Sequence, residues 1–287
     1  MKSQIGIWVN AAAILLGLGL WLGLPHSVAA AATASATGAS AQCPRAGTLG
    51  TSRVLTVDPK IYPRVGLKSF PQTLPLHDHE VVLTFDDGPS PPRTNKVLAE
   101  LAKECVRATF FLVGEPASGR ASVVQKIAAE GHTIGHHTYT HANLAHLTPA
   151  QAIQEIDRGI AADEKALHGV STTTPSTPFF RFPYFESTPA TLQLLQSRGI
   201  AVFGADLWAG DWNPISPEQE LKILTSRLEQ DRKGIILLHD PQPRTDAMLP
   251  AFLRYLKQHG YKVVHIVPPA TKQSDEAAQP DIHAARD

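Results

Sequence analysis

The sequence contains little cysteine and no excess of charge of either sign. Its 287 residues include 26 lysines and arginines, 26 aspartates and glutamates, and only two cysteines. The absence of a Lys/Arg-rich run argues against a nucleic-acid partner and against an anionic membrane surface. With 43% hydrophobic and 18% charged residues, the composition is typical of a globular protein. We therefore expect a monomer with a small or neutral partner.

Two cysteines cannot supply a disulfide framework. Cys43 lies in a stretch rich in alanine, serine and threonine, whereas Cys105 shares a helical face with Val97 and Leu101. The simplest interpretation of Cys105 is a buried core thiol. A bridge between Cys43 and Cys105 is the alternative, because an exported protein can form disulfides.

The one long apolar run lies at the N-terminus. It extends from Ile5 to Leu24 behind a single lysine and leads into small residues that suit a signal-peptidase site near Ala29 or Ala30. We interpret residues 1–30 as a signal peptide. An uncleaved membrane anchor is the alternative, since about 20 apolar residues can span a bilayer. Either reading places the body of the protein outside the cytoplasm, in the periplasm or the extracellular space.

The rest of the chain divides by composition. Residues 31–54 have no apolar period and predict a flexible leader outside the fold. Residues 55–80 contain four prolines and predict an extended wrap over the domain. Residues 81–268 predict a single domain, and residues 269–287 predict a polar, disordered tail.

Short apolar runs alternate with amphipathic stretches from residue 81 onward. Thr148, Thr188 and Ser216 each precede a proline, which predicts a helix start, because the hydroxyl caps the first turn and proline fits the first helical position. Repeated strand–helix units predict an α/β fold with a parallel sheet that closes into a barrel. The expected strands are 81–85, 108–113, 132–136, 179–182, 200–207, 235–239 and 262–267.

Reactive side chains gather at the carboxyl ends of these strands, which we call the rim. Barrel enzymes collect their catalytic residues there. The side chains in question are Asp86, Asp87, His137, His141, Arg181, Tyr184, Asp206, Asp211, Trp212 and His239.

The spacing of two histidines indicates a metal site. His137 and His141 are four residues apart, which predicts that both imidazoles lie on one side of a helical turn. Such spacing also arises by chance in a chain with 13 histidines. The interpretation as a metal site therefore depends on the position of both histidines on the rim, where the adjacent acids Asp86 and Asp87 also lie. Two imidazoles and one carboxylate hold a divalent metal and leave positions open for water and substrate.

The two adjacent acids, Asp86 and Asp87, would then have different roles. One would bind the metal, and the other would accept a proton from a water whose pKa the metal lowers to roughly 7. We expect Arg181 to orient this base through a bidentate contact and His239 to protonate a departing amine. The constellation is that of a hydrolase acting on an amide or an ester.

Five ordered motifs resemble those of the polysaccharide deacetylase family, also called the NodB-homology or carbohydrate esterase family 4 domain. They are TFDDGP (84–89), HTYTH (137–141), RFPY (181–184), DW (211–212) and LLH (237–239). The resemblance covers about residues 80–267. It implies a distorted (β/α)7-type barrel that removes N- or O-linked acetyl groups from an extracellular or cell-envelope glycan. It also implies one divalent ion, with zinc expected first and cobalt, nickel or manganese as alternatives.

The resemblance further implies a role for each motif residue. These are Asp86 as general base, Arg181 to position it, Asp87, His137 and His141 as metal ligands, His239 as general acid supported by Asp211, the Tyr184 backbone N–H as oxyanion donor, and Trp212 and Leu237 as lining of the acetyl pocket.

Two features depart from the family pattern. Phe185 and Glu186 follow the RFPY motif where many members have glycine, which leaves the shape of the substrate groove open. Asp206 lies five residues before Asp211, so the sequence leaves open which of these two acids contacts His239. A glycan-binding protein without turnover and a metal-dependent amidase for non-sugar amides are the alternative functions.

Overall fold

The computed structural model describes residues 43–270 of the chain. The predicted signal peptide or anchor, residues 1–30, and nearly all of the predicted tail lie outside this range. Among residues 43–270, no helix has the length and hydropathy of a membrane-spanning segment.

A parallel sheet organises the described residues. Strand β3 (Glu80–Asp86) pairs with β4 (Thr109–Leu112) on one side and with β9 (Gly234–His239) on the other. From β4 the sheet continues through β5, β6 and β7 to β2, while β8 joins the far side of β9. Every strand pairing within residues 43–270 is parallel, as the repeated strand–helix pattern predicted. The other strands are β1 (Thr51–Thr56), β2 (Arg64–Val65), β5 (Thr133–His136), β6 (Phe179–Phe180), β7 (Ala201–Phe203), β8 (Leu207–Trp208) and β10 (Lys262–Val267).

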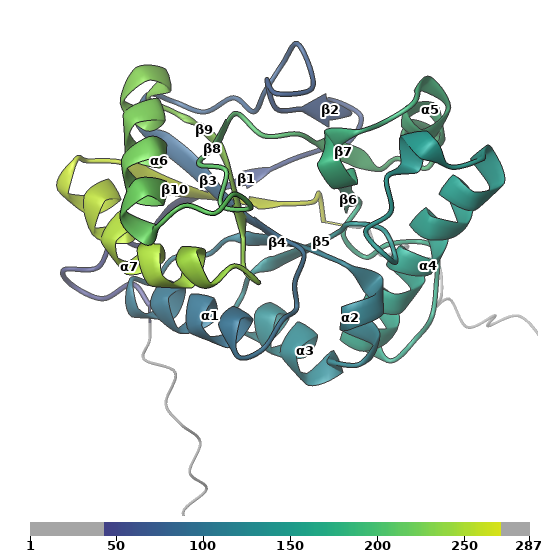
Figure 1. The fold of residues 1–287 in the computed structure, drawn as a ribbon, viewed down its shortest axis with the longest axis horizontal. Helices are drawn as coiled ribbons and strands as arrows, with labels where there is room; N and C mark the ends of the chain where they lie inside the picture. The colour runs from purple at the N-terminus through teal and green to yellow at the C-terminus, as the bar shows by residue number, and fades with distance from the viewer. Residues whose placement is uncertain (1–42, 271–287) are drawn as a thin grey trace, which may run out of the picture. The chain divides into compact units, whose positions relative to one another are not determined.

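Helices surround the strands (Figure 1). The three predicted helix starts are confirmed, because Thr148, Thr188 and Ser216 each form a capping box at the N-terminus of α4, α5 or α6. Each box satisfies backbone N–H groups that have no partner inside the helix. The helices are α1 (Arg93–Lys103), α2 (Gly114–Ser118), α3 (Ala121–Ala129), α4 (Pro149–His168), α5 (Pro189–Ser197), α6 (Pro217–Asp231) and α7 (Pro243–Gln258), with 3-10 turns η1 (Leu144–His146) and η2 (Pro183–Phe185).

Side-chain alternation along β3 explains how an apolar strand delivers an acid. Val81, Leu83 and Phe85 belong to the core cluster that includes helix residues, whereas Val82 belongs to a second cluster with residues of β7, β9 and β10. Successive side chains of a strand point to opposite faces. Asp86 therefore projects on the same side as Val82, toward the inside of the curved sheet.

The leader predicted for residues 31–54 is wrong for its described part. Strand β1 pairs with β10, and Cys43 forms a disulfide with Cys105, so residues 43–54 belong to the fold. The strand escaped prediction because four residues of its sequence, TSRVLT, are polar and its side chains are alternately half-buried and exposed. The interpretation of Cys105 as a free core thiol is also wrong, since the residue lies beyond α1 with a φ of 55° and pairs with Cys43.

The strand expected over 200–207 divides into β7, which pairs with β6 and β2, and β8, which pairs with β9. The carbonyl groups of Phe203 and Gly204 accept hydrogen bonds from the guanidinium of Arg181. A Cβ atom on Gly66 would lie 2.5 Å from the backbone of Gly204, so only glycine fits this approach. The carbonyls at the carboxyl end of β7 thus bind a buried cation.

Candidate active site

Strand register brings the predicted residues together. Asp86 and His239 occupy paired positions at the ends of β3 and β9. His136 pairs with Phe180 of β6, so His137 and Arg181 follow neighbouring strands. Residues far apart in the sequence therefore meet at one rim.

Asp87, His137 and His141 form a cluster with the geometry of a metal site. Asp87 Oδ1 lies 3.4 Å from His137 Nε2 and 3.2 Å from His141 Nε2. One ligand atom from each residue falls within 4.8 Å of the others, and Asp87 Oδ1 is buried without a hydrogen-bond partner among the described residues. Burial raises the pKa of Asp87, but the two imidazoles outweigh it and hold that pKa well below the ordinary value. An anionic oxygen facing two nitrogens fits a divalent cation.

A loop, and not a helical turn, brings the two imidazoles together. The segment from His137 to His141 has no helix, and its backbone reverses through left-handed conformations at Thr138 (φ 65°) and His141 (φ 61°). The ring centroids lie 4.9 Å apart. The prediction of a shared helical face is therefore wrong, although its consequence, that the rings are neighbours, is correct.

Helix α4 fixes this loop from behind. A Cβ atom on Gly159 would lie 2.5 Å from the carbonyl carbon of Thr138, so the helix approaches the loop as closely as a glycine permits. The Thr138 carbonyl also accepts a hydrogen bond of 3.0 Å from the N–H of Gly114. A backbone conformation that costs energy is thus held by its surroundings.

The neighbouring motif sets the orientation of His137. Its Nδ1 lies 2.7 Å from the carbonyl oxygen of Arg181, to which it donates its proton. The Nε2 lone pair is then left to face Asp87. A hydrogen bond of this kind fixes the tautomer of a metal-ligating histidine.

Asp86 forms a buried ion pair with Arg181. The two residues are 2% and 0% exposed, and Arg181 Nη1 donates to Asp86 Oδ1 at 2.7 Å. The expected bidentate contact is wrong, because the other guanidinium donors reach the carbonyls of Phe203 and Gly204 at the end of β7, while Nη1 also reaches Thr84. Burial lowers the pKa of Arg181 and the charge of Asp86 opposes this, but an arginine stays cationic. Asp86 Oδ2 is left facing the rim, 3.9 Å from His137 Nε2.

His239 meets Asp211, which answers the question that the sequence left open. Asp211 Oδ1 accepts from His239 Nδ1 and Oδ2 accepts from the His239 backbone N–H, both at 2.8 Å. Burial lowers the pKa of His239, but the Asp211 contact outweighs it and raises the pKa to about 9. Asp206 instead accepts hydrogen bonds from the backbone of Leu67 and Ile235.

A cavity of about 470 Å³ contains these groups. Tyr184 and Trp212 are 63% and 49% exposed, whereas Leu237 is buried. Lys68 and Trp208 also line the cavity without having been predicted. Trp208 ends β8 and could have been found as an aromatic residue at a strand end, but Lys68 carries no signal in the sequence. The remaining lining residues are Asp86, Asp87, His137, His141, Phe182, Phe185 and His239.

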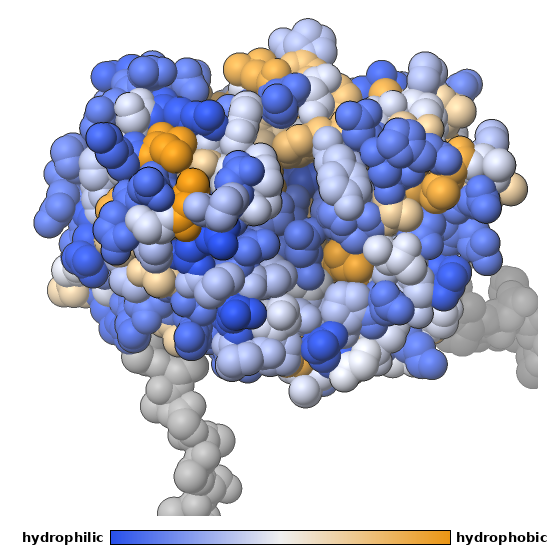
Figure 2. Space-filling view, viewed as in Figure 1, coloured by the Kyte–Doolittle hydropathy of each residue, from blue (hydrophilic) through white to orange (hydrophobic). Residues whose placement is uncertain are grey.

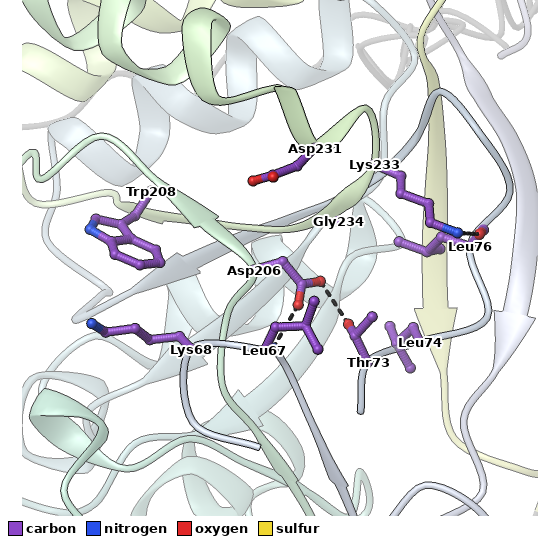
Figure 3. A pocket seen from close by; sticks show the side chains of 10 residues that line it. All are labelled: Leu67, Lys68, Thr73, Leu74, Leu76, Asp206, Trp208, Asp231, Lys233 and Gly234. Carbon is purple, nitrogen blue, oxygen red and sulfur yellow. Dashed lines mark hydrogen bonds between the residues drawn. The ribbon is translucent and has the colours of Figure 1, made fainter. Parts of the chain in front are cut away.

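A second cavity, of about 430 Å³, lies beside the first and shares Lys68 and Trp208 with it (Figure 3). Two of its charged groups are engaged, because Asp206 accepts from Leu67 and Thr73 and Lys233 donates to the Leu76 carbonyl. Trp208 is held against the cations of Lys68 and Arg227. The cavity contains no histidine, so the predicted chemistry belongs to the first cavity. Figure 2 shows a mostly hydrophilic face with small, separate apolar patches, which suits a polar ligand.

Comparison with known proteins identifies the family. The sequence profile of the polysaccharide deacetylase family matches residues 74–203. A chitooligosaccharide deacetylase of Sinorhizobium fredii is 32% identical over 164 residues, which are 57% of this chain and 73% of that protein. The chain belongs to the polysaccharide deacetylase family. The first three sequence motifs lie inside the matched residues, and those with Asp211 and His239 follow them.

Other polysaccharide deacetylases agree with this assignment. A peptidoglycan-N-acetylglucosamine deacetylase of Bacillus cereus is 34% identical over 169 residues, 59% of this chain and 58% of that protein. The structure of a peptidoglycan deacetylase of Bdellovibrio bacteriovorus superposes with a TM-score of 0.68 at 28% identity, covering 80% of this chain and 63% of that one. The chain thus spans less than two thirds of either protein. The predicted fold, the distorted (β/α)7 barrel of this family, is confirmed.

Proposed function

We propose that this polysaccharide deacetylase is a metal-dependent hydrolase that removes acetyl groups from an N-acetylglucosamine-containing glycan of the cell envelope or extracellular space. The convergence of Asp87 with two imidazoles, beside Asp86 and His239, is the observation that carries the proposal. The names of the Bacillus cereus and Sinorhizobium fredii relatives support the substrate class.

Asp87, His137 and His141 would hold the metal, with zinc as first choice for a set of two imidazoles and one carboxylate. When bound, the ion would lower the pKa of a water molecule and polarise the acetyl carbonyl. His137 is already oriented for this task by the Arg181 carbonyl.

The chain's own residues then move two protons. Asp86 Oδ2 would take a proton from the attacking water, while Arg181 keeps the other oxygen in place. As the C–N bond of the acetamide breaks, His239 Nε2 would give its proton to the departing amine, and acetate is the second product. Asp211 stabilises the imidazolium that this step requires. The Tyr184 N–H would stabilise the oxyanion, and Trp212 and Leu237 would enclose the acetyl methyl group.

Acetate release from a substrate panel tests the proposal. The panel contains peptidoglycan, chitotetraose, acetylated xylan and a non-sugar N-acetyl amide, each with protein that is metal-loaded or treated with a chelator. We expect release from at least one glycan, loss with the chelator and recovery with zinc. Saccharide binding without acetate release by any metal-loaded sample would contradict the proposal. Acetate release from the non-sugar amide alone would show that the substrate is a non-sugar amide and not a glycan.

We also propose that the protein is exported by cleavage of residues 1–30. The names of relatives that act on peptidoglycan support an envelope location. The intact mass of the exported form decides this, because cleavage near Ala30 removes the whole apolar run. A full-length mass in the membrane fraction would favour the anchor instead.

A further inference from the structure

A second buried acid lies behind the pair of Asp211 and His239. Glu220, in the first turn of α6, is 0% exposed, as is Asp211. The hydroxyl of Thr245 joins them, since Thr245 Oγ1 lies 2.7 Å from Asp211 Oδ2 and 3.2 Å from Glu220 Oε1. Two carboxyl groups thus share one hydroxyl inside the protein.

The hydrogen count does not allow both acids to be ionised and satisfied. A threonine hydroxyl has one proton to donate and can accept two more. Asp211 Oδ2 is the closer acceptor, and both oxygens of Asp211 already accept hydrogen bonds from N–H groups of His239. The Thr245 proton therefore points to Asp211. The contact between Thr245 and Glu220 is a hydrogen bond only if Glu220 supplies the proton.

The charges around Glu220 agree with this assignment. Arg244 is the cation that acts on Glu220, but its guanidinium donates to the backbone carbonyls of Asp211 and Asn213 and not to a carboxylate. The contact with Thr245 and the charge of His239 also lower the pKa of Glu220, yet burial and the charge of Asp211 outweigh all three effects and raise it to about 8.

We propose that Glu220 is a positioning residue, held as a neutral acid, which donates to Thr245 and so directs the Thr245 hydroxyl to Asp211. Asp211 Oδ2 then receives two donors, the His239 N–H and the Thr245 hydroxyl, while Oδ1 is reserved for His239 Nδ1. The carboxylate cannot rotate away from the imidazole, and Nε2 remains aimed at the cavity. The consequence for turnover rests on the proposed deacetylation, but the hydrogen-bond assignment does not.

Carboxyl NMR of the full-length protein labelled with ¹³C-glutamate tests the assignment without substrate. One glutamate resonance, absent from Glu220→Gln, should titrate above pH 7. The resonance of the exposed Glu218 on the same turn should titrate below the ordinary range, because the Ser216 hydroxyl donates to it and lowers its pKa. A Glu220 resonance that titrates at pH 4–5 would overturn the proposal.

Kinetic variants test the consequence. An amide can replace the carboxylic acid as donor to Thr245, so Glu220→Gln should keep kcat within about twofold and leave its pH profile unchanged. Glu220→Leu lacks the donor and should lower kcat about fivefold with KM unchanged, in line with one lost hydrogen bond. Glu218→Leu is the matched control and should leave both constants unchanged.

The outcomes separate the two proposals. A Gln variant as impaired as the Leu variant would overturn the role of Glu220, and if Glu220→Leu does not fold, Glu220→Gln and the NMR titration still decide. If neither the parent protein nor any variant releases acetate, the proposed function fails, but the NMR titration still tests the protonation of Glu220.

Discussion

Asp86 and His239 are paired residues on adjacent parallel strands, β3 and β9, although 152 residues separate them in the sequence. One strand delivers the proposed base and its neighbour the proposed acid, each held by its own buried partner, Arg181 or Asp211. The strand register itself therefore sets the spacing between the two groups.

Replacing Asp86 with asparagine should lower kcat by at least 100-fold, because a neutral amide cannot accept the proton of the attacking water. Zinc content should be unchanged, since Asp87 and the two histidines remain. Acetate release and metal analysis of the same preparation check this, with Asp157→Asn as a surface control that removes a partly exposed ion pair with Arg198. Normal turnover in Asp86→Asn would show that Asp86 is not the general base.

Gly159→Ala should weaken metal binding although the residue is no ligand. The added methyl group would lie 2.5 Å from the Thr138 carbonyl carbon, so the loop that carries His137 and His141 must shift, at a cost of about 1–3 kcal/mol. Zinc titration of the variant measures the effect. Gly119→Ala is the matched control, because a Cβ there meets nothing within 4 Å. Equal zinc affinities in both variants would refute the role of this packing.

The disulfide between Cys43 and Cys105 should stabilise the protein without contributing to the site. It links residues 62 apart, for which the loss of unfolded-chain entropy is worth about 4 kcal/mol. Urea unfolding of Cys43→Ser against the oxidised parent measures the difference. Acetate release at 25 °C should be retained. A Cys43→Ser variant that still unfolds in a cooperative transition but has lost activity would contradict this account.

Two neutral histidines at the amino-terminal side of the sheet should make stability sensitive to acid. Burial lowers the pKa of His132 to about 3 and that of His265 to about 4, both below the unfolded value of 6.5. The unfolded chain therefore binds protons first as the pH falls below 6.5. Each histidine then costs up to about 1.4 kcal/mol of stability per pH unit, until the pH reaches its folded pKa.

His265→Gln isolates this effect from the other titrating groups. An amide can replace the donor that His265 Nε2 offers to Thr133 Oγ1, whose own proton goes to the Ile266 carbonyl. The difference in unfolding free energy between parent and variant should shrink from pH 7 to pH 5. A difference that is constant over this range would show that His265 is not neutral in the folded state.

The sequence predicted most of the barrel because apolar runs and capping residues act locally. Thr148-Pro149 starts α4 whatever packs against it, and Val81 to Phe85 must be buried. The residues of the site were predicted from the sequence motifs, whereas the contacts that hold these residues in place were not. Arg181 divides its donors between Asp86 and the carbonyls of Phe203 and Gly204, which come together only in the folded sheet. Glu220 looks in the sequence like an exposed acid in the first turn of a helix. Its neutral form depends on Asp211 and Thr245, which approach only in three dimensions.

Metal-dependent acetate release tests the central claim most directly. Chitotetraose is incubated with protein that was stripped by a chelator and then titrated with zinc, alongside His141→Ala and the exposed control His146→Ala. We expect activity to rise with zinc to a single equivalent in the parent and in His146→Ala, and to stay at least 100-fold lower in His141→Ala. Full activity in the stripped protein, or an unchanged zinc response in His141→Ala, would contradict the account.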